Sequence, residues 1–470
     1  MLRLSLSIVL FLSLFICFIV LYRYKKTGYI FLSVLALLQT TPFILRFYFS
    51  GISDNFVLWA SNPDANIASF YFFADFSLKI FSVTLFTLLL KPKALNIKAS
   101  TRNHALALSD YSFKIKKIKT YSILILFLSV IVSWVIAGPS FFSINRTELL
   151  STVNPIFKIL MPAAWLSGCF WYITTAQQIR FYIIKYGLTH SFNGIANIKG
   201  LILILLHALP LFLISLFNAR GQLLNCSILF ALFLSPVLNI RSTITQFFKS
   251  FLALKVRINS LWIFIVIPVF LHAVKNSRDF VNGIAYLFVP ESISSYHLVS
   301  VASQLDLPRS LLLNPDASII DSYSVLSEMG SISDPVSSFF CSLLRVVPNT
   351  IRYSNSSCLS VIDQLNLYAN PSYLETYMGF NILMSIEVLM IFGLLGFFLL
   401  PFLLGYLIAK SNLYVQASIY EPPNVYQYLV PILMVQTSFL NADLGGLFQW
   451  LIFSLVYTFL ILRMPQLTAK

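Results

Sequence analysis

The chain has 470 residues and a formal net charge of +15, and 58% of its residues are hydrophobic while only 10% are charged. Soluble domains average roughly 25% charged residues, so this composition excludes an ordinary soluble enzyme or binding domain. Apolar runs that approach the ~20 residues needed to cross a bilayer recur along the chain. The sequence therefore predicts an all-α, polytopic integral membrane protein, in which the positive charge marks cytoplasmic loops rather than a nucleic-acid partner.

About 11 apolar stretches are predicted to be transmembrane helices, with ends placed to within several residues. They lie near residues 4–22, 28–49, 66–90, 121–138, 157–176, 201–217, 222–239, 259–275, 388–409, 425–440 and 446–463. The first stretch lacks a basic start and a small-residue cleavage site, so it is predicted to be a retained span rather than a signal peptide.

The distribution of basic residues predicts the orientation of these spans. Segment 91–120 carries eight basic residues against one acid, which is typical of a cytoplasmic loop. On this topology, residues 1–274 hold transmembrane helices 1–8 with basic cytoplasmic loops, including 177–200. Residues 275–378 then form one large periplasmic loop, and residues 379–470 hold transmembrane helices 9–11.

The large loop is rich in Ser, Asn, Asp and Pro, and loops of this length are usually binding loops or lids. Its strips FFCSLLRVV and CLSVIDQLNLY are predicted to be amphipathic helices that dock onto the membrane domain, although an undocked tether is the alternative. Cys341 and Cys358 both lie in this loop, where an oxidising compartment permits a disulfide, and two buried thiols are the alternative. Cys17, Cys169 and Cys226 lie in predicted spans as core residues.

The basic residues predicted to face outward are mostly arginines. They are Arg146, Arg220, Arg278, Arg309, Arg345 and Arg352, joined by Lys158 and Lys275 near span ends. Orientation needs only positive charge, whereas the planar guanidinium fork binds phosphate in a bidentate manner. The preference predicts a diphosphate partner at the membrane surface. Pairing with loop acids, such as Arg278 with Asp279, is the alternative for any single arginine.

Two charged residues lie inside the third predicted span. Asp75 and Lys79 are four residues apart, so they can form an intrahelical ion pair. Charge inside a span is by default a hypothesis of a functional site, and a self-neutralising structural pair is the alternative.

Four short motifs occur in a characteristic order: INRTELL, ISLFNARGQLL, RVVPNTIR and GFNILMSIEVLMIFGLLGFFLLPFLLGYLI. Together they resemble the bacterial O-antigen polymerase (Wzy) family over roughly residues 140 to 410. That family is polytopic with a large periplasmic loop, and it joins oligosaccharide repeat units carried on undecaprenyl diphosphate. The resemblance implies a glycosyltransferase of the bacterial inner membrane whose partners are the lipid-linked oligosaccharide, membrane lipids and a chain-length regulator protein.

The resemblance also assigns roles to residues. Arg146 and Arg220 are expected near the carrier diphosphate as catalytic residues, and Arg345 and Arg352 are expected to bind the same group, with Arg278 added from the arginine pattern. Glu387, in MSIEVLM, is expected to orient an arginine or to accept the proton of a sugar hydroxyl. His297 is a second candidate base in the outer loop.

No cofactor or metal is expected, because the sequence contains no GxxxxGK[ST], HExxH or DxD motif. Three rival functions remain open on the sequence alone. The first is an O-antigen ligase that uses the same donor. The second is a flippase or transporter of lipid-linked oligosaccharides, which the long loop and the lack of an internal repeat disfavour. The third is a structural scaffold.

Overall fold

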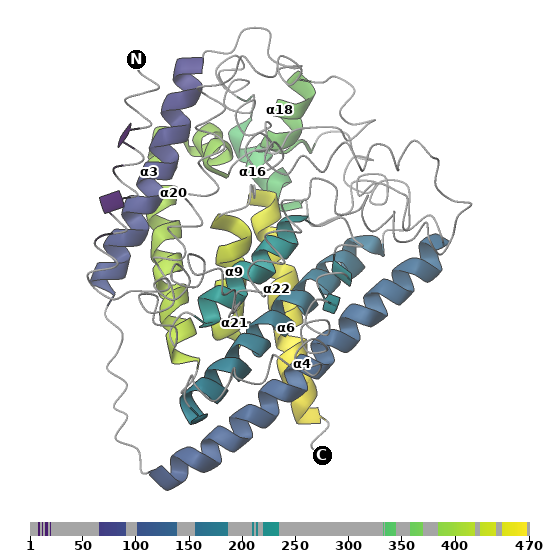
Figure 1. The fold of residues 1–470 in the computed structure, drawn as a ribbon. Coiled ribbons are helices and arrows are strands. Elements are labelled where there is room, and N and C mark those ends of the chain that lie inside the picture. The colour runs from purple at the N-terminus through teal and green to yellow at the C-terminus, as the bar shows by residue number, and fades with distance from the viewer. Residues whose placement is uncertain are drawn as a thin grey trace, which may run out of the picture. The chain divides into compact units, whose positions relative to one another are not determined.

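The computed structural model describes part of the chain, and every regular element in that part is a helix (Figure 1). The described residues are 65–90, 101–138, 156–186, 209–210, 213–214, 220–234, 332, 334–344, 358–369, 384–418, 424–438 and 444–467, together with 8, 9, 12, 15, 16 and 19. The predicted spans 28–49 and 259–275 lie outside these residues, as do most of 4–22 and 201–217.

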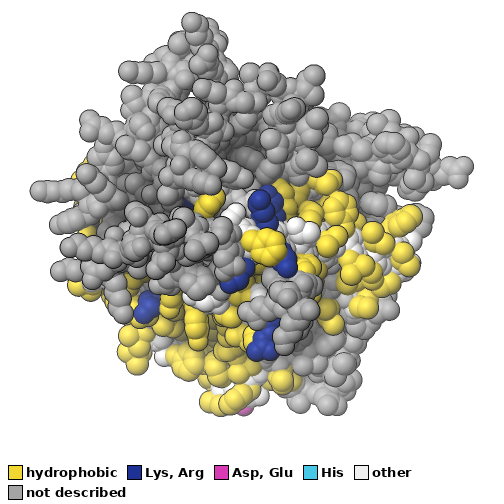
Figure 2. Space-filling view, turned by 90° about the horizontal axis from the view of Figure 1, so that it is seen from below, with side chains coloured by type: hydrophobic (Ala, Val, Ile, Leu, Met, Phe, Trp, Pro, Cys, Tyr) yellow, Lys and Arg dark blue, Asp and Glu magenta, His cyan; other side chains and the backbone are white. Residues whose placement is uncertain are grey.

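Four of the described helices are long and apolar enough to cross a membrane. They cover Ser112–Ala137, Ile159–Phe181, Met384–Val415 and Leu444–Met464. Hydrophobic side chains make up much of the described surface in Figure 2, with Lys and Arg side chains between them. The chain is therefore a helical membrane protein in its described part.

The chain divides into two compact units, and neither is continuous in sequence. The first unit comprises Met1–Lys91, Leu311–Ser411 and Leu433–Ile452. The second comprises Pro92–Ser310, Asn412–Ile432 and Phe453–Lys470.

In the second unit, helix α4 (Thr101–Ala137) begins about twenty residues before the predicted span 121–138. The predicted loop 91–120 is helical from Thr101 onward, and its cytoplasmic side stays a prediction. No Gly or Pro interrupts the sequence from Thr101 to Ala137, so the lysine-rich stretch continues the apolar helix without a break. Gly138 follows with a φ of 63°, and the next residue is Pro139, a combination that ends helices.

Helix α6 (Phe157–Tyr186) also extends beyond its predicted span, into the predicted loop 177–200. Arg180, which belongs to that segment, is fully buried. Its Nη1 donates to the carbonyl oxygen of Val415 at 2.9 Å and to Ser418 Oγ at 3.4 Å. A cation is favourable at the carboxyl end of a helix, because the last carbonyls there lack helical partners. Arg180 therefore acts in packing rather than as a loop charge.

Helix α9 (Arg220–Leu234) packs against α6 within the second unit. Tyr172 meets Phe230 edge to face, with ring centroids 6.1 Å apart. Nearby, Cys169 Sγ and Cys226 Sγ are 3.9 Å apart, and both residues are fully buried. The predicted core role of these two cysteines is confirmed.

This proximity gives a direct test of the α6–α9 packing. Mild oxidation with iodine, which enters bilayers, is expected to join Cys169 to Cys226, because a movement of about 2 Å brings the sulfurs to bonding distance. Mass spectrometry of a proteolytic digest would detect the linked peptides. Cys226→Ala is the matched control and should give no such species. Two thiols that are each oxidised by iodine but never linked to each other would contradict the packing.

In the first unit, helix α3 (Ala65–Leu89) lies beside helix α20 (Met384–Ala417), as Figure 1 shows. Tyr71 pairs with Phe397 and Phe86 with Tyr406, at centroid distances of 5.4 and 5.6 Å. The second pair lies further along the sequence than the first on both helices, so the two helices run parallel here. Gly405 allows the close approach, since a Cβ there would lie 2.7 Å from the backbone of Ser82 on α3.

Helix α20 is not a straight rod. Gly393 has φ 65° and ψ −161°, which is non-helical and is a region open essentially only to glycine. A Cβ on Gly396 would lie 3.2 Å from the carbonyl oxygen of Val388. In an unbroken helix, residues eight positions apart are separated by about 12 Å along the axis. The segment Met384–Phe392 therefore folds back on the segment that follows Gly393. We call these two segments and their glycine turn the α20 hairpin.

The hairpin corrects the predicted span 388–409, which assumes one continuous helix. From Leu394 to Ala417 the helix rises about 36 Å, enough to cross a bilayer without the first segment. Helices α21 (Val425–Ser438) and α22 (Leu444–Leu467) agree with the predicted spans near 425–440 and 446–463.

Candidate functional site

Polar side chains gather in the first unit around the start of the α20 hairpin. They come from three helices that are otherwise largely apolar or amphipathic: Asp75 and Lys79 from α3, Ser342 from α16 (Pro335–Leu343), and Ser385 and Glu387 from α20. We call these five residues the polar cluster. A carboxylate or an ammonium group in such surroundings is costly unless it is paired or used, so each contact of the cluster is relevant to function.

Two short helices of the large loop pack against each other, and the first of them supplies Ser342 to the cluster. Helix α16 (Pro335–Leu343) begins after Asp334, whose side chain accepts a hydrogen bond from Ser337 N at 3.1 Å, and proline fills the first helical position. Helix α18 (Val361–Ala369) begins directly after Ser360, whose backbone N–H donates to Asp363 Oδ2 at 3.0 Å. The helices predicted from FFCSLLRVV and CLSVIDQLNLY are thus confirmed, with α16 starting earlier and ending sooner than its strip.

A disulfide joins the two loop helices. Cys341 on α16 is bonded to Cys358, just before α18, and Gln364 Nε2 donates to Ser338 Oγ at 2.6 Å. The disulfide alternative for Cys341 and Cys358 is therefore confirmed. A cross-link between residues 17 apart in sequence contributes about 3 kcal/mol by restricting the unfolded chain. The closed segment carries Arg345 and Arg352 in its sequence.

Helix α16 docks onto the α20 hairpin. Phe339 packs against a buried core, and its ring lies 5.7 Å from that of Phe392. The core consists of Met384, Val388, Leu400, Leu404 and Leu444. For this part of the loop, docking is confirmed and the tether alternative is wrong.

Glu387 links three elements through one carboxylate. It is fully buried, and its Oε1 accepts a hydrogen bond from Ser342 Oγ on α16. Its Oε2 accepts a hydrogen bond from the backbone N–H of Leu444 at 2.6 Å. Leu444 is the first residue of α22, and a negative charge is favourable at a helix amino terminus. Glu387 therefore fixes the docked loop and the start of α22 to the hairpin.

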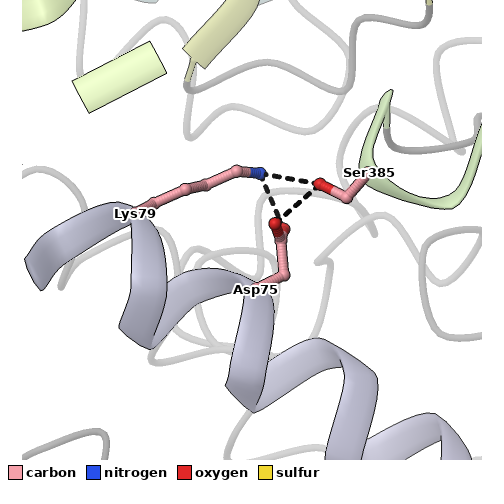
Figure 3. Close-up of polar contacts among 3 residues, drawn as sticks. All are labelled: Asp75, Lys79 and Ser385. Atoms are coloured by element: carbon pink, nitrogen blue, oxygen red, sulfur yellow. Dashed lines mark hydrogen bonds and ion pairs between the residues drawn. The ribbon is translucent and has the colours of Figure 1, made fainter. Parts of the chain in front are cut away.

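The second half of the cluster is a closed triangle, shown in Figure 3. Lys79 Nζ donates to Asp75 Oδ2 at 2.6 Å and to Ser385 Oγ at 3.1 Å, while Ser385 Oγ donates to Asp75 Oδ1 at 2.7 Å. The predicted intrahelical pair is confirmed. The sequence does not predict the link to Ser385, since Ser385 is 310 residues away and a lone serine in a span carries no signal.

The predicted arginines are described only in part. Arg220 is the first residue of α9, and its side chain lies outside the described residues. Arg146, Arg278, Arg345, Arg352 and His297 also lie outside them. The arginine cluster around a diphosphate thus stays a prediction. In sequence, Arg345 follows Ser342, the partner of Glu387, by only three residues.

No family model, curated protein or solved structure matches this chain. Among the described residues, no three His, Cys, Asp or Glu side chains gather closely enough to hold a metal ion. What the cluster offers is a fixed carboxylate, Glu387, and a paired ammonium group, Lys79, in one apolar unit. Such groups serve to orient charged ligands and to move protons.

Proposed function

We propose that this protein polymerises undecaprenyl-diphosphate-linked oligosaccharide repeat units at the periplasmic face of the bacterial inner membrane. It would span the membrane about 11 times and hold the large loop in the periplasm. The observation that carries the proposal is the position of Glu387. Glu387 belongs to the motif that resembles the O-antigen polymerase family. Its carboxylate lies in the polar cluster and accepts a hydrogen bond from Ser342 on α16, which precedes Arg345 in the sequence.

The reaction would be a glycosyl transfer without nucleotide or metal. A hydroxyl of an incoming lipid-linked repeat unit attacks the anomeric carbon of the growing chain, and undecaprenyl diphosphate leaves. Arg146, Arg220, Arg345 and Arg352 would stabilise the charge on the departing diphosphate, at a few kcal/mol for each donor. Glu387 would orient an arginine or accept the hydroxyl proton, and His297 is the second candidate base.

Deletion of the gene tests the proposal on a single lipopolysaccharide gel. Loss of a polymerase leaves the core with one repeat unit. Loss of a ligase leaves bare core while lipid-linked polymer accumulates, and loss of a flippase leaves bare core and no polymer. A normal ladder of chain lengths would exclude a polymerase, a ligase and a flippase, and would leave the structural scaffold as the remaining function.

Arg220→Lys and Arg146→Lys are each expected to reduce polymer formation at least tenfold at unchanged protein level. The reason is that lysine keeps the charge but loses the bidentate fork. Immunoblots and the polymer ladder give the two readouts. Lys116→Arg, on α4, is the matched control and should leave the ladder unchanged. Full activity of both lysine variants would rule out a forked contact with the diphosphate.

Fusions at Ser322 test the proposed side of the large loop. Alkaline phosphatase joined there should be active, because it folds only in an oxidising compartment, and a cytoplasmic fluorescent protein should be dark. Fusions at Lys93, in the predicted cytoplasmic segment before α4, should behave in the opposite way. Inverted results at both positions would reverse the topology and remove the periplasmic assignment.

A further inference from the structure

The two charged members of the triangle in Figure 3 differ in exposure. The side chain of Asp75 is 0% exposed, whereas that of Lys79 is 18% exposed. Of the two paired charges, the cation is therefore the one that retains some exposed surface.

Structural pairing alone accounts poorly for this arrangement. A buried ion pair is often no more stabilising than an apolar pair of similar size, because desolvation offsets the attraction. An i,i+4 pair is also complete on its own helix. Here both partners additionally contact Ser385, which lies two residues before Glu387 on the first turn of the hairpin. The hydrogen bond to Ser385 thereby holds the ammonium group of Lys79 against the segment that carries Glu387, the proposed active carboxylate.

We propose that Lys79 binds a phosphate group of the lipid-linked substrate, an inference that rests on the proposed function. An ammonium group has three N–H donors. In the described part of the chain, two of these donors bond Asp75 and Ser385. A phosphate oxygen of the substrate would accept a hydrogen bond from the third donor. Asp75 keeps the ammonium group of Lys79 oriented when no substrate is bound. Ser385 holds the ammonium group against the hairpin.

A charge exchange separates binding from pairing. The double variant Asp75→Lys/Lys79→Asp keeps an i,i+4 ion pair on α3 and keeps a hydroxyl partner in Ser385. It moves the cation to the fully buried position and places the anion where the ligand would arrive. A structural pair tolerates this exchange, but a phosphate-binding lysine does not. Asp75→Asn/Lys79→Met, which removes both charges, is a second variant in case the exchanged protein fails to fold.

The assay measures binding of undecaprenyl diphosphate to the full-length protein in phosphatidylcholine nanodiscs by native mass spectrometry. We expect Kd to rise at least tenfold in the exchanged variant and in the neutral variant, and less than threefold in Lys79→Arg. Thermal unfolding verifies that each variant is folded. Inorganic diphosphate should compete weakly, since the substrate is held by its lipid as well as its phosphates.

Each outcome decides a stated point. Unchanged Kd in a folded exchanged or neutral variant overturns the role of Lys79 and leaves the polymerase proposal in place. No binding to the wild-type protein overturns both. Competition by inorganic diphosphate at equal affinity overturns the lipid-linked source of the phosphate.

Discussion

Glu387→Ala is expected to abolish polymer formation and to lower protein stability, whereas Glu387→Gln is expected to retain both in part. Alanine leaves Ser342 Oγ and the N–H of Leu444 without their acceptor. An unsatisfied buried donor costs about 1–3 kcal/mol. Helix α16 and the start of α22 would then both lose their link to the hairpin.

Glutamine preserves the geometry, because its oxygen can accept from Leu444 N–H while its amide donates to Ser342 Oγ. The hydroxyl only has to reverse its role. The substitution removes the negative charge that faces the amino terminus of α22 and any arginine. A loss of about tenfold in polymer, with a normal immunoblot, is the expected result for a positioning carboxylate.

Other results are equally informative about Glu387. A loss of a hundredfold or more in a well-folded Glu387→Gln protein would identify the carboxylate as the general base. Near-normal polymer from Glu387→Ala would exclude both roles. Ser342→Ala is the matched control, because it removes one of the two donors and leaves the carboxylate in place.

Gly393→Ala is expected to disrupt the α20 hairpin. No atom lies within 4 Å of a Cβ at this position, so the effect arises from the backbone alone. A φ of 65° with a ψ of −161° costs a non-glycine residue about 1–3 kcal/mol. Relief of that strain straightens α20 and separates Ser385 and Glu387 from their partners. We expect polymer to fall at least tenfold and the unfolding temperature in detergent to drop.

Gly138→Ala provides the control for Gly393. Gly138 also has a positive φ, 63°, and free space around its Cβ, but it ends α4 in the other unit. It should lower the unfolding temperature while leaving polymer formation near normal. If Gly393→Ala were as stable and as active as the wild-type protein, the glycine turn would have no role in the site.

Hydropathy is sufficient to predict the positions of several helices. The apolar stretches locate α3, α21 and α22 to within a few residues, and the compartment argument anticipates the Cys341–Cys358 bond. The start of α4 and the end of α6 are misplaced, because a charged stretch is not necessarily a loop. Lysine is a good helix former, and Arg180 is buried by a helix end that lies 235 residues away.

The hairpin and the polar cluster are beyond sequence reasoning for a different reason. FGLLG in an apolar stretch does not reveal which of its two glycines takes a positive φ: Gly393 does, and Gly396 does not. Two partners of Glu387 are a serine and a backbone N–H, and neither type carries a signal in sequence. Glu387 itself stands out in the sequence because a carboxylate beside a span is unusual.

The spacing of the triangle has a consequence for how the protein is made. On the predicted topology, where residues 66–90 form a span, Asp75 and Lys79 enter the bilayer long before the ribosome reaches Ser385, which lies 310 residues beyond Asp75. A single charge at the centre of an inserting helix costs about 2.5–3.5 kcal/mol. The i,i+4 pair neutralises both charges within α3 itself, so this helix can be integrated before its later partner exists.

Glu387 is completed in a different way. Its carboxylate accepts a hydrogen bond from the backbone N–H of Leu444. Leu444 lies 57 residues further along the chain, at the start of the last described helix. The site therefore acquires its full set of contacts only when α22 has been synthesised. Nascent chains that end before α22 would carry an unfinished carboxylate, a feature by which membrane quality control can distinguish them from the complete protein.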